Sequence, residues 1–177
     1  ADATITVIPA DAAEPDGTNT PVTPSEPASD PFNPNAESGS KAQFDDVTAS
    51  DWYVEAVRYA VENGLMNGTG DGRFSPKANT TRGMIVTMLA RVEGISTSGM
   101  PWYGAGQRWA MEHEISDGTN MPGAITREQL AAILYRYAKL KGYDVSKTAE
   151  ISGYADAAQV SSYAADAMRW AVGSGLL

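Results

Sequence analysis

Cysteine is absent from this 177-residue sequence, and histidine occurs once, as His113. The lack of cysteine excludes disulfides, thiol catalysis and thiolate metal sites, and a single histidine excludes a multi-histidine metal centre. No apolar run approaches the roughly 18 residues that a membrane-crossing helix needs, so we expect no membrane insertion. The first residues, 1–4, lack the basic start and apolar stretch of a signal peptide. We therefore expect no metal, no cofactor and no signal peptide.

Positive charge is also scarce, because 13 Lys and Arg residues face 22 Asp and Glu residues, for a net charge of -9. Residues 1–40 contain seven acidic residues and no Lys or Arg, which leaves a charge of only -2 for residues 41–177. A nucleic-acid partner requires a basic stripe on the protein surface. The charge therefore disfavours nucleic acid, and we expect no nucleic-acid partner.

Proline is concentrated near the N-terminus, where seven of the ten prolines lie between Pro9 and Pro34. Polar residues separate them, and such a segment buries too little apolar surface to offset the entropy of ordering it. We interpret residues 1–40 as an acidic, Pro-rich extended linker. The alternation Thr4–Ile8 is typical of a strand, either the last of a preceding domain or one that docks elsewhere.

The rest of the sequence repeats itself. A Trp-Tyr pair at Trp52 recurs fifty residues later at Trp102 and, in weaker form, at Tyr163, and each is followed by Arg, an aromatic residue and Ala. Thr81-Arg82 recurs forty-five residues later as Thr126-Arg127, so the second copy lacks five loop residues. The copies are predicted to span residues 41–96, 97–147 and 148–177.

Each copy has the pattern of a helix, a loop and a second helix. Val54, Val57 and Val61 recur at helical spacing, and a glycine-rich loop, Asn67–Gly72, follows that helix. Thr126, with Gln129 three residues later, predicts a capping box at the start of a second helix. One helix pair cannot bury its apolar faces alone, so the copies are expected to pack on one another.

The third copy reaches Leu177 where its glycine-rich loop would begin. Its second helix is therefore missing from this sequence. Either the chain is shortened there, or another protein chain completes the third copy.

The motif residues of copy one resemble the surface-layer homology (SLH) family. They are Phe44, Asp46, Trp52, Tyr53, Ala56, Ala60, Gly64, Gly68, Asp71, Gly72, Phe74, Pro76, Thr81, Arg82, Leu89 and Arg91. The resemblance implies an all-α fold of helix-loop-helix repeats in a pseudo-threefold bundle. It also implies grooves that bind secondary cell-wall polysaccharide, often carrying a pyruvate ketal. The arginine of the family's Thr-Arg-Ala-Glu motif, which contributes to the groove, maps onto Arg82 and Arg127.

The sequence departs from the family pattern in both complete copies. Copy one has Gly83-Met84 where the motif has Ala-Glu, and copy two has Gln129 in place of the glutamate. Copy two also lacks the Asp-Gly-x-Phe-x-Pro element of the loop. One complete groove is therefore expected.

Six residues are the candidate polysaccharide contacts. Arg82 and Arg127 each follow a helix N-cap, where an anionic ligand would meet a guanidinium and free backbone N–H groups. The alternative for Arg82 is an ion pair with a loop carboxylate such as Asp71. Trp52 and Trp102 are candidates to stack on a sugar ring, and core packing between copies is an equal alternative.

The remaining candidates are Asp71 and Gly72, in the loop before Arg82. A turn shaped by glycines explains this loop better than a calcium site, because Ala78 stands where a bidentate glutamate would be needed. The lead-in acids Asp45 and Asp46 are interpreted as helix-entry residues. With them set aside, no pair of carboxylates or nucleophile suggests catalysis.

The sequence thus predicts a non-catalytic, extracellular module at the bacterial cell surface, in the cell wall or S-layer. Its expected partner is cell-wall polysaccharide. The alternative is a protein–protein assembly module of a cell-surface protein, and an enzyme acting on the wall is the least favoured reading.

Overall fold

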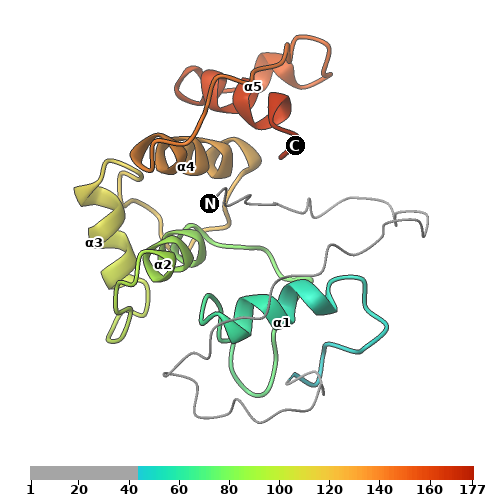
Figure 1. Ribbon diagram of the computed structural model, residues 1–177, viewed down its shortest axis with the longest axis vertical. Helices are drawn as coiled ribbons and strands as arrows, with labels where there is room; N and C mark the ends of the chain where they lie inside the picture. Colours follow the sequence, from blue (N-terminus) through green and yellow to red (C-terminus); the bar gives the residue numbers. More distant parts are fainter. Residues whose placement is uncertain (1–43) are drawn as a thin grey trace.

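The computed structural model describes residues 44–177, and these residues contain five α-helices and no β-strand (Figure 1). The predicted all-α fold is confirmed. The linker predicted for residues 1–40 and the strand predicted at Thr4–Ile8 lie outside the described residues. The copy boundaries and the pseudo-threefold packing stay predictions.

The helices lie where the repeat pattern predicts them. Copy one contains α1 and α2, copy two contains α3 and α4, and α5 belongs to copy three after two short 3-10 turns. Their bounds are Val54–Glu62 (α1), Arg82–Val92 (α2), Gly104–Glu112 (α3), Arg127–Leu140 (α4), Ala165–Gly173 (α5), Ala157–Gln159 (η1) and Ser162–Ala164 (η2).

The second helix of each complete copy begins with a threonine cap. The Thr126 hydroxyl accepts a hydrogen bond from the Gln129 amide at 3.3 Å, and the Gln129 side chain accepts one from the Thr126 amide at 3.2 Å. The predicted capping box is therefore confirmed. At α2 the Thr81 hydroxyl accepts from the Met84 amide at 3.2 Å, and the Met84 sulfur replaces the amide oxygen as the return acceptor.

Helices pack across the copy boundaries: α2 lies against α3, and α4 lies against α5 (Figure 1). One apolar core joins these four helices, and Leu89, Ile115 and Tyr137 are among its fully buried side chains. Gly106 makes the approach of α3 to α2 possible, because a Cβ there would lie 2.8 Å from the Cα of Thr87. Helices of neighbouring copies therefore share one core.

Helix α1 lies apart from the group formed by α2 to α5 (Figure 1). Its Val57 is buried together with Val47 of the lead-in, but neither belongs to the core of the other four helices. The Arg91 guanidinium of α2 binds the segment after this helix by donating to the Leu65 carbonyl at 2.9 Å. Copy one is thus held together largely by its loop and its lead-in.

The lead-in of copy one binds the loop between α1 and α2. The Asp46 carboxylate accepts hydrogen bonds from the amides of Phe74 and Ser75 at 2.8 and 2.9 Å. These bonds, the Phe74 amide foremost, hold the pKa of Asp46 below its ordinary value. The Asp45 amide donates to the Gly72 carbonyl at 2.9 Å. Asp45 and Asp46 therefore organise a loop about 28 residues away in the chain.

The helix-entry role predicted for these two acids is wrong. Helix α1 begins at Val54 after Tyr53, several residues beyond the lead-in. The Phe44 ring packs on Phe74, with 5.3 Å between ring centroids, and completes the contact between lead-in and loop. Copy two lacks both sides of this contact, since neither an acidic lead-in nor the Asp-Gly-x-Phe element occurs in it.

Candidate functional site

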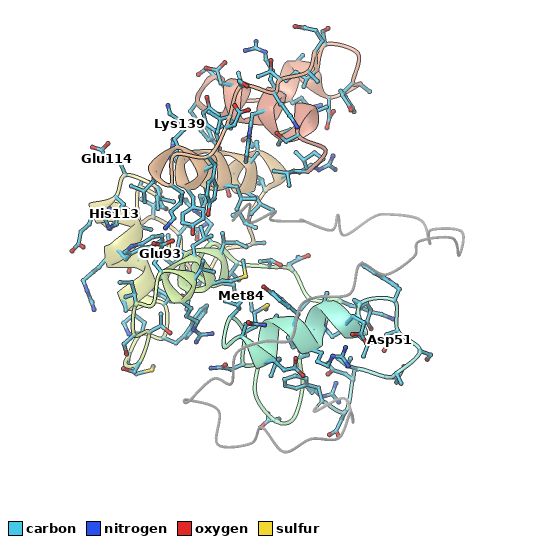
Figure 2. The ribbon with its side chains drawn as sticks, viewed as in Figure 1. Asp51, Met84, Glu93, His113, Glu114 and Lys139 are labelled. Carbon is cyan, nitrogen blue, oxygen red and sulfur yellow. The ribbon has the colours of Figure 1, made fainter. Side chains whose placement is uncertain are left out.

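A cleft of about 370 Å³ lies between the loop of copy one, helix α2 and the start of copy two. Such a volume falls in the range of small-ligand sites, roughly 300–1,000 Å³. Met84, which lines it, lies on the side of α2 toward α1 (Figure 2). The lining residues are Leu65, Met66, Asn67, Gly68, Thr69, Met84, Thr87, Arg91 and Trp102.

Trp102 is the aromatic wall of this cleft, and it is 44 % exposed. Its ring meets the next tyrosine edge-on, at a centroid distance of 5.3 Å. Trp52 repeats this geometry at 5.4 Å and is 56 % exposed, but it does not line the cleft. Trp109 and Trp170 are the tryptophans of the core. Exposed surface on Trp102 is therefore available to a ligand.

Arg91 supplies positive charge to the cleft. Its Nε donates to the Thr97 hydroxyl at 2.8 Å, and its guanidinium also donates to the Leu65 carbonyl. Within residues 44–177, no carboxylate forms an ion pair with it. Partial burial lowers its pKa from the ordinary value, a sign that the cation has lost part of its hydration. A partly desolvated cation without a counter-charge favours an anionic ligand.

Thr87 lies one helical turn before Arg91 on the same wall. The residue is only 3 % exposed, and its hydroxyl oxygen has no hydrogen-bond partner in the described part of the chain. Leaving a buried hydroxyl unsatisfied costs about 1–3 kcal/mol. Its oxygen has almost no accessible surface, so this hydroxyl is enclosed in the wall rather than open to the cleft.

The glycine-rich loop forms the opposite wall with its first residues. Gly68 adopts φ 79°, and a Cβ there would lie 2.6 Å from the Arg73 carbonyl oxygen. Asp71 is exposed with φ 51°, and the Gly72 carbonyl is taken by the lead-in; neither residue lines the cleft. The interpretation of this loop as a turn shaped by glycines is confirmed. The described residues hold no cluster of acidic or histidine side chains suited to a metal ion.

Arg82 lies outside the cleft and binds the loop of copy two. Its guanidinium donates to Asp117 at 2.6 Å, Thr119 at 3.1 Å and Ser116 at 3.2 Å, and its side chain is only 12 % exposed. The Thr119 amide, and then Arg82, lower the pKa of Asp117. The carboxylate that neutralises Arg82 is thus Asp117 of the next copy and not the Asp71 considered from the sequence.

The first amides of α2 are also occupied. The Arg82 amide donates to the Gly123 carbonyl at 3.1 Å, and the Gly83 amide donates to the Met121 carbonyl at 2.8 Å. An anion at this helix start would meet bonded N–H groups rather than free ones. Gly83 also permits close contact with copy two, because a Cβ there would lie 3.3 Å from the Trp102 ring.

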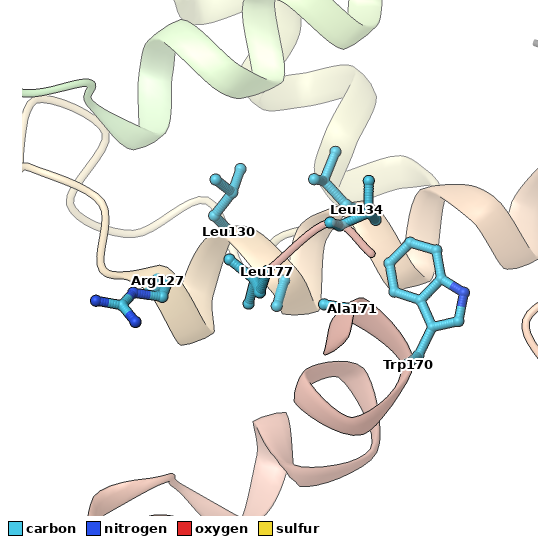
Figure 3. A pocket seen from close by; sticks show the side chains of 8 residues that line it. Arg127, Leu130, Leu134, Trp170, Ala171 and Leu177 are labelled. Carbon is cyan, nitrogen blue, oxygen red and sulfur yellow. The ribbon is translucent and has the colours of Figure 1, made fainter. Parts of the chain in front are cut away.

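Arg127, at the matching position of copy two, is exposed and forms no ion pair within residues 44–177. It borders a hollow of about 10 Å³ between α4 and α5, where Leu177 and Trp170 face Leu134 (Figure 3). That volume suits about one water molecule and no sugar. The hollow beside Arg127 is therefore too small for the ligand expected there.

Glu128 follows Arg127 and ties copy three to α4. Its carboxylate accepts from the Ser161 amide at 2.8 Å, from the Ser161 hydroxyl at 3.0 Å and from the Tyr163 hydroxyl at 3.2 Å. The Ser161 amide is the main cause that lowers the pKa of Glu128. This glutamate serves the joint between copies.

Sequence reasoning did not identify Arg91 and Thr87 as residues that line the cleft. The sequence does mark Arg91 as a repeated position, since Arg136 follows it by the same forty-five residues that separate Arg82 from Arg127. Arg136 donates to the Ile115 carbonyl at 3.2 Å, as Arg91 does to Leu65. Thr87 carried no signal, because an unpaired hydroxyl becomes visible only when the surrounding helices are in place.

Residues 43–83 match the family model described as the S-layer homology domain. The resemblance inferred from the sequence is thereby confirmed for this segment, which contains α1, its loop and the start of α2. The S-layer homology domain is a non-catalytic anchoring module, so this segment indicates a cell-surface or cell-wall protein. Among residues 44–177, no helix has both the length and the apolar character that crossing a membrane requires.

Three characterised relatives are similar to parts of this chain. An endoglucanase of Bacillus sp. (strain KSM-635) is 27 % identical over 150 residues, which is 77 % of this chain and 16 % of the relative. The S-layer protein sap of Bacillus anthracis and an S-layer protein of Bacillus thuringiensis subsp. finitimus are each 37 % identical over 49 residues, or 28 % of this chain. The matched region covers 6 % of each S-layer protein. The chain thus spans a small part of these relatives.

Proposed function

We propose that this chain is a non-catalytic anchoring module that binds secondary cell-wall polysaccharide, with pyruvylated polymer as the preferred ligand. The module attaches a surface protein to the wall. The coarser part of this function, anchoring at the cell surface, follows from the S-layer homology domain in residues 43–83.

The observation that carries the proposal is the combination of side chains in the cleft of copy one. Trp102 offers an exposed ring, and the C–H face of a sugar suits such an apolar, aromatic surface. Arg91 adds a cation without a counter-charge, and guanidinium groups pair well with carboxylates. A sugar that carries a carboxylate would satisfy both walls at once.

The binding experiment uses purified wall polysaccharide in two forms, native and stripped of its ketal carboxylate, titrated into the chain by calorimetry. We expect the native polymer to bind and the stripped polymer to bind at least about tenfold more weakly, a difference of about 1.4 kcal/mol. Equal and weak binding of both forms would contradict the proposal. Single replacements of Trp52, Arg82, Arg127 and Asp71 with Ala, and Gly72→Ala, test the contacts expected from the sequence.

Trp102→Ala is the most direct variant for the ring surface. The side chain is half exposed, so its removal is expected to weaken binding more than it lowers stability. Trp52→Ala is the matched control, because Trp52 has the same local geometry and lies outside the cleft.

A second candidate function, assembly with another protein chain, is favoured by α1. This helix lies outside the shared core and exposes Tyr59. Light scattering at rising protein concentration separates the two functions: a monomer that binds polysaccharide supports anchoring, and a defined oligomer with no polysaccharide binding supports assembly.

A further inference from the structure

The dipeptide Asn-Gly occurs twice in the sequence, as Asn63-Gly64 and Asn67-Gly68, both in copy one. In such a pair the backbone nitrogen of the glycine can attack the side-chain amide carbon of the asparagine, because glycine has no Cβ to hinder the approach. Ammonia leaves, and water opens the cyclic imide to aspartate or isoaspartate. The reaction needs a free side chain and a free backbone N–H, so the local structure decides which pair reacts.

The first pair is held by hydrogen bonds at the end of α1. The Asn63 side chain donates to the Tyr59 carbonyl at 2.8 Å, and the Gly64 N–H donates to the Val61 carbonyl at 2.9 Å. Attack of the Gly64 nitrogen on Asn63 would require both bonds to break. The fold therefore protects this pair.

The second pair lies in the loop that follows. Asn67 is exposed and outside any helix, and within residues 44–177 neither its side chain nor the Gly68 N–H forms a hydrogen bond. The amides on either side, those of Met66 and Thr69, donate to backbone carbonyls at 3.1 and 2.8 Å. The loop is thus anchored around a pair whose reacting groups are free in the described chain.

A carboxylate at position 67 would enter the cleft. Asn67 lines it together with Arg91, the one charged side chain among the described residues that line it. Arg91 donates to the carbonyl of Leu65, two residues before Asn67, and forms no ion pair within residues 44–177. Conversion of the amide to an acid would therefore change the charge of the cleft from positive to neutral.

We propose that Asn67 is a site of spontaneous deamidation and that the carboxylate it forms neutralises Arg91. The Gly68 nitrogen bonds to the side-chain carbon of Asn67, its proton leaves with the amide group as ammonia, and water adds to either carbonyl of the imide. Isoaspartate lengthens the backbone just before Gly68, where a Cβ would already lie 2.6 Å from the Phe44 ring. The effect on a ligand rests on the proposed function, and the modification itself does not.

The test follows the folded chain by peptide mapping during storage in mildly alkaline buffer. Trypsin releases residues 59–73, which contain both asparagines, and fragment ions that break the peptide between them assign the mass increase to one or the other. We expect Asn67 to react at least about tenfold faster than Asn63 in the folded chain. In the free synthetic peptide 59–73, which lacks the bonds of the fold, the two rates are expected to agree within about threefold.

Equal rates at the two asparagines in the folded chain would overturn the inference. So would a folded chain that spares Asn67 while the free peptide reacts at both positions.

Two variants test the charge. Asn67→Gln blocks the reaction, since its longer side chain forms a larger and less favoured ring, and Asn67→Asp supplies the carboxylate at once. The affinity of the unaltered chain for native wall polysaccharide is expected to fall on storage in step with the modified fraction, and stored Asn67→Gln should keep the affinity of its own fresh preparation. Asn67→Asp is expected to bind at least about threefold more weakly than the fresh unaltered chain.

The proposed function and this inference fail in different ways. A fresh chain that binds no wall polysaccharide contradicts the proposed function, and the peptide map still decides whether Asn67 is modified. If the fresh chain binds and Asn67→Asp binds equally well, the neutralisation of Arg91 is overturned.

Discussion

The joint between copies one and two differs from the joint between copies two and three at one matching position. Gly83 lets the Trp102 ring approach α2, and Trp102 borders a cleft of about 370 Å³. Glu128, forty-five residues later, instead binds Ser161 and Tyr163, and the nearby hollow holds about 10 Å³. One joint relies on close packing beside a cleft, and the other relies on a carboxylate.

The difference shows that one position of the repeat makes a different contact in each copy. Copy one has Gly83 at this position, where the Trp102 ring lies close, and copy two has Glu128, which accepts hydrogen bonds from Ser161 and Tyr163. The copy with the small residue at this position is the one whose joint borders the ligand-sized cleft.

The largest expected effect comes from giving copy one the residue of copy two. In Gly83→Glu, the new Cβ would lie 3.0 Å from the Met121 carbonyl oxygen and 3.1 Å from the Cβ of Tyr103, and the longer side chain would displace Trp102. We expect a loss of about 3 kcal/mol in the free energy of unfolding, measured by urea denaturation, since overpacking costs about 1–3 kcal/mol. Polysaccharide binding in the cleft is expected to fall with it.

Gly83→Ala is the control for side-chain size, because it adds the Cβ alone. It is expected to lower the free energy of unfolding clearly less than Gly83→Glu does. A Gly83→Glu chain that unfolds at the urea midpoint of the unaltered protein would show that the two joints are interchangeable.

Removing the carboxylate of the second joint is expected to have the next largest effect. Glu128→Ala leaves the Ser161 amide and hydroxyl without their acceptor, at a cost of about 1–2 kcal/mol. Thermal unfolding followed by circular dichroism measures the loss, and binding in the cleft of copy one should not change. Glu128→Gln keeps one acceptor oxygen and serves as the control; equal Tm values for all three chains would refute the role given to this carboxylate.

Arg82 and Arg127 provide a matched pair with a smaller effect. Arg82→Ala removes bonds to three side chains of copy two and is expected to cost about 1 kcal/mol. Arg127→Ala is expected to change stability by less than about 0.5 kcal/mol, since Arg127 is exposed and forms no ion pair within residues 44–177. The urea midpoints of the two variants are measured side by side. Equal losses of stability in Arg82→Ala and Arg127→Ala would contradict the structural role given to Arg82.

The smallest effect is the pH dependence of the first joint. The pKa of Asp117 is lowered in the fold, so its contribution to stability is present above the ordinary Asp pKa of about 3.9 and is lost as pH falls through the lower folded value. Asp117→Asn removes that contribution at every pH. The Tm difference between the two chains is expected at pH 6 and should shrink below about pH 4. If the Tm difference between the two chains grew as the pH fell, the lowered pKa of Asp117 would be contradicted.

The helices and their caps could be predicted from local pattern. The spacing of apolar residues gives α1 and α2, and Thr126 with Gln129 three residues later gives a capping box, because these features depend on neighbours in the chain. The family of residues 43–83 could be predicted for the same reason, since its motif is linear.

The partners of charged residues could not be predicted from local pattern. Asp46 binds amides about 28 residues away, and Arg82 pairs with Asp117 some 35 residues away rather than with Asp71. Several carboxylates lie within reach of each cation in sequence, and only the approach of one copy to the next selects among them. The unpaired hydroxyl of Thr87 depends in the same way on packing that no spacing records.

The bonds of the lead-in to the loop carry a mechanical consequence for an anchor. The described chain begins with Phe44 and, two residues later, Asp46 holds Ser75, whose hydroxyl lies 2.6 Å from the hydroxyl of Thr69 in the cleft wall. A pull applied to the chain from the side of residue 43 reaches these bonds before it reaches any helix. Such a pull is therefore passed to the wall of the cleft through one carboxylate, that of Asp46.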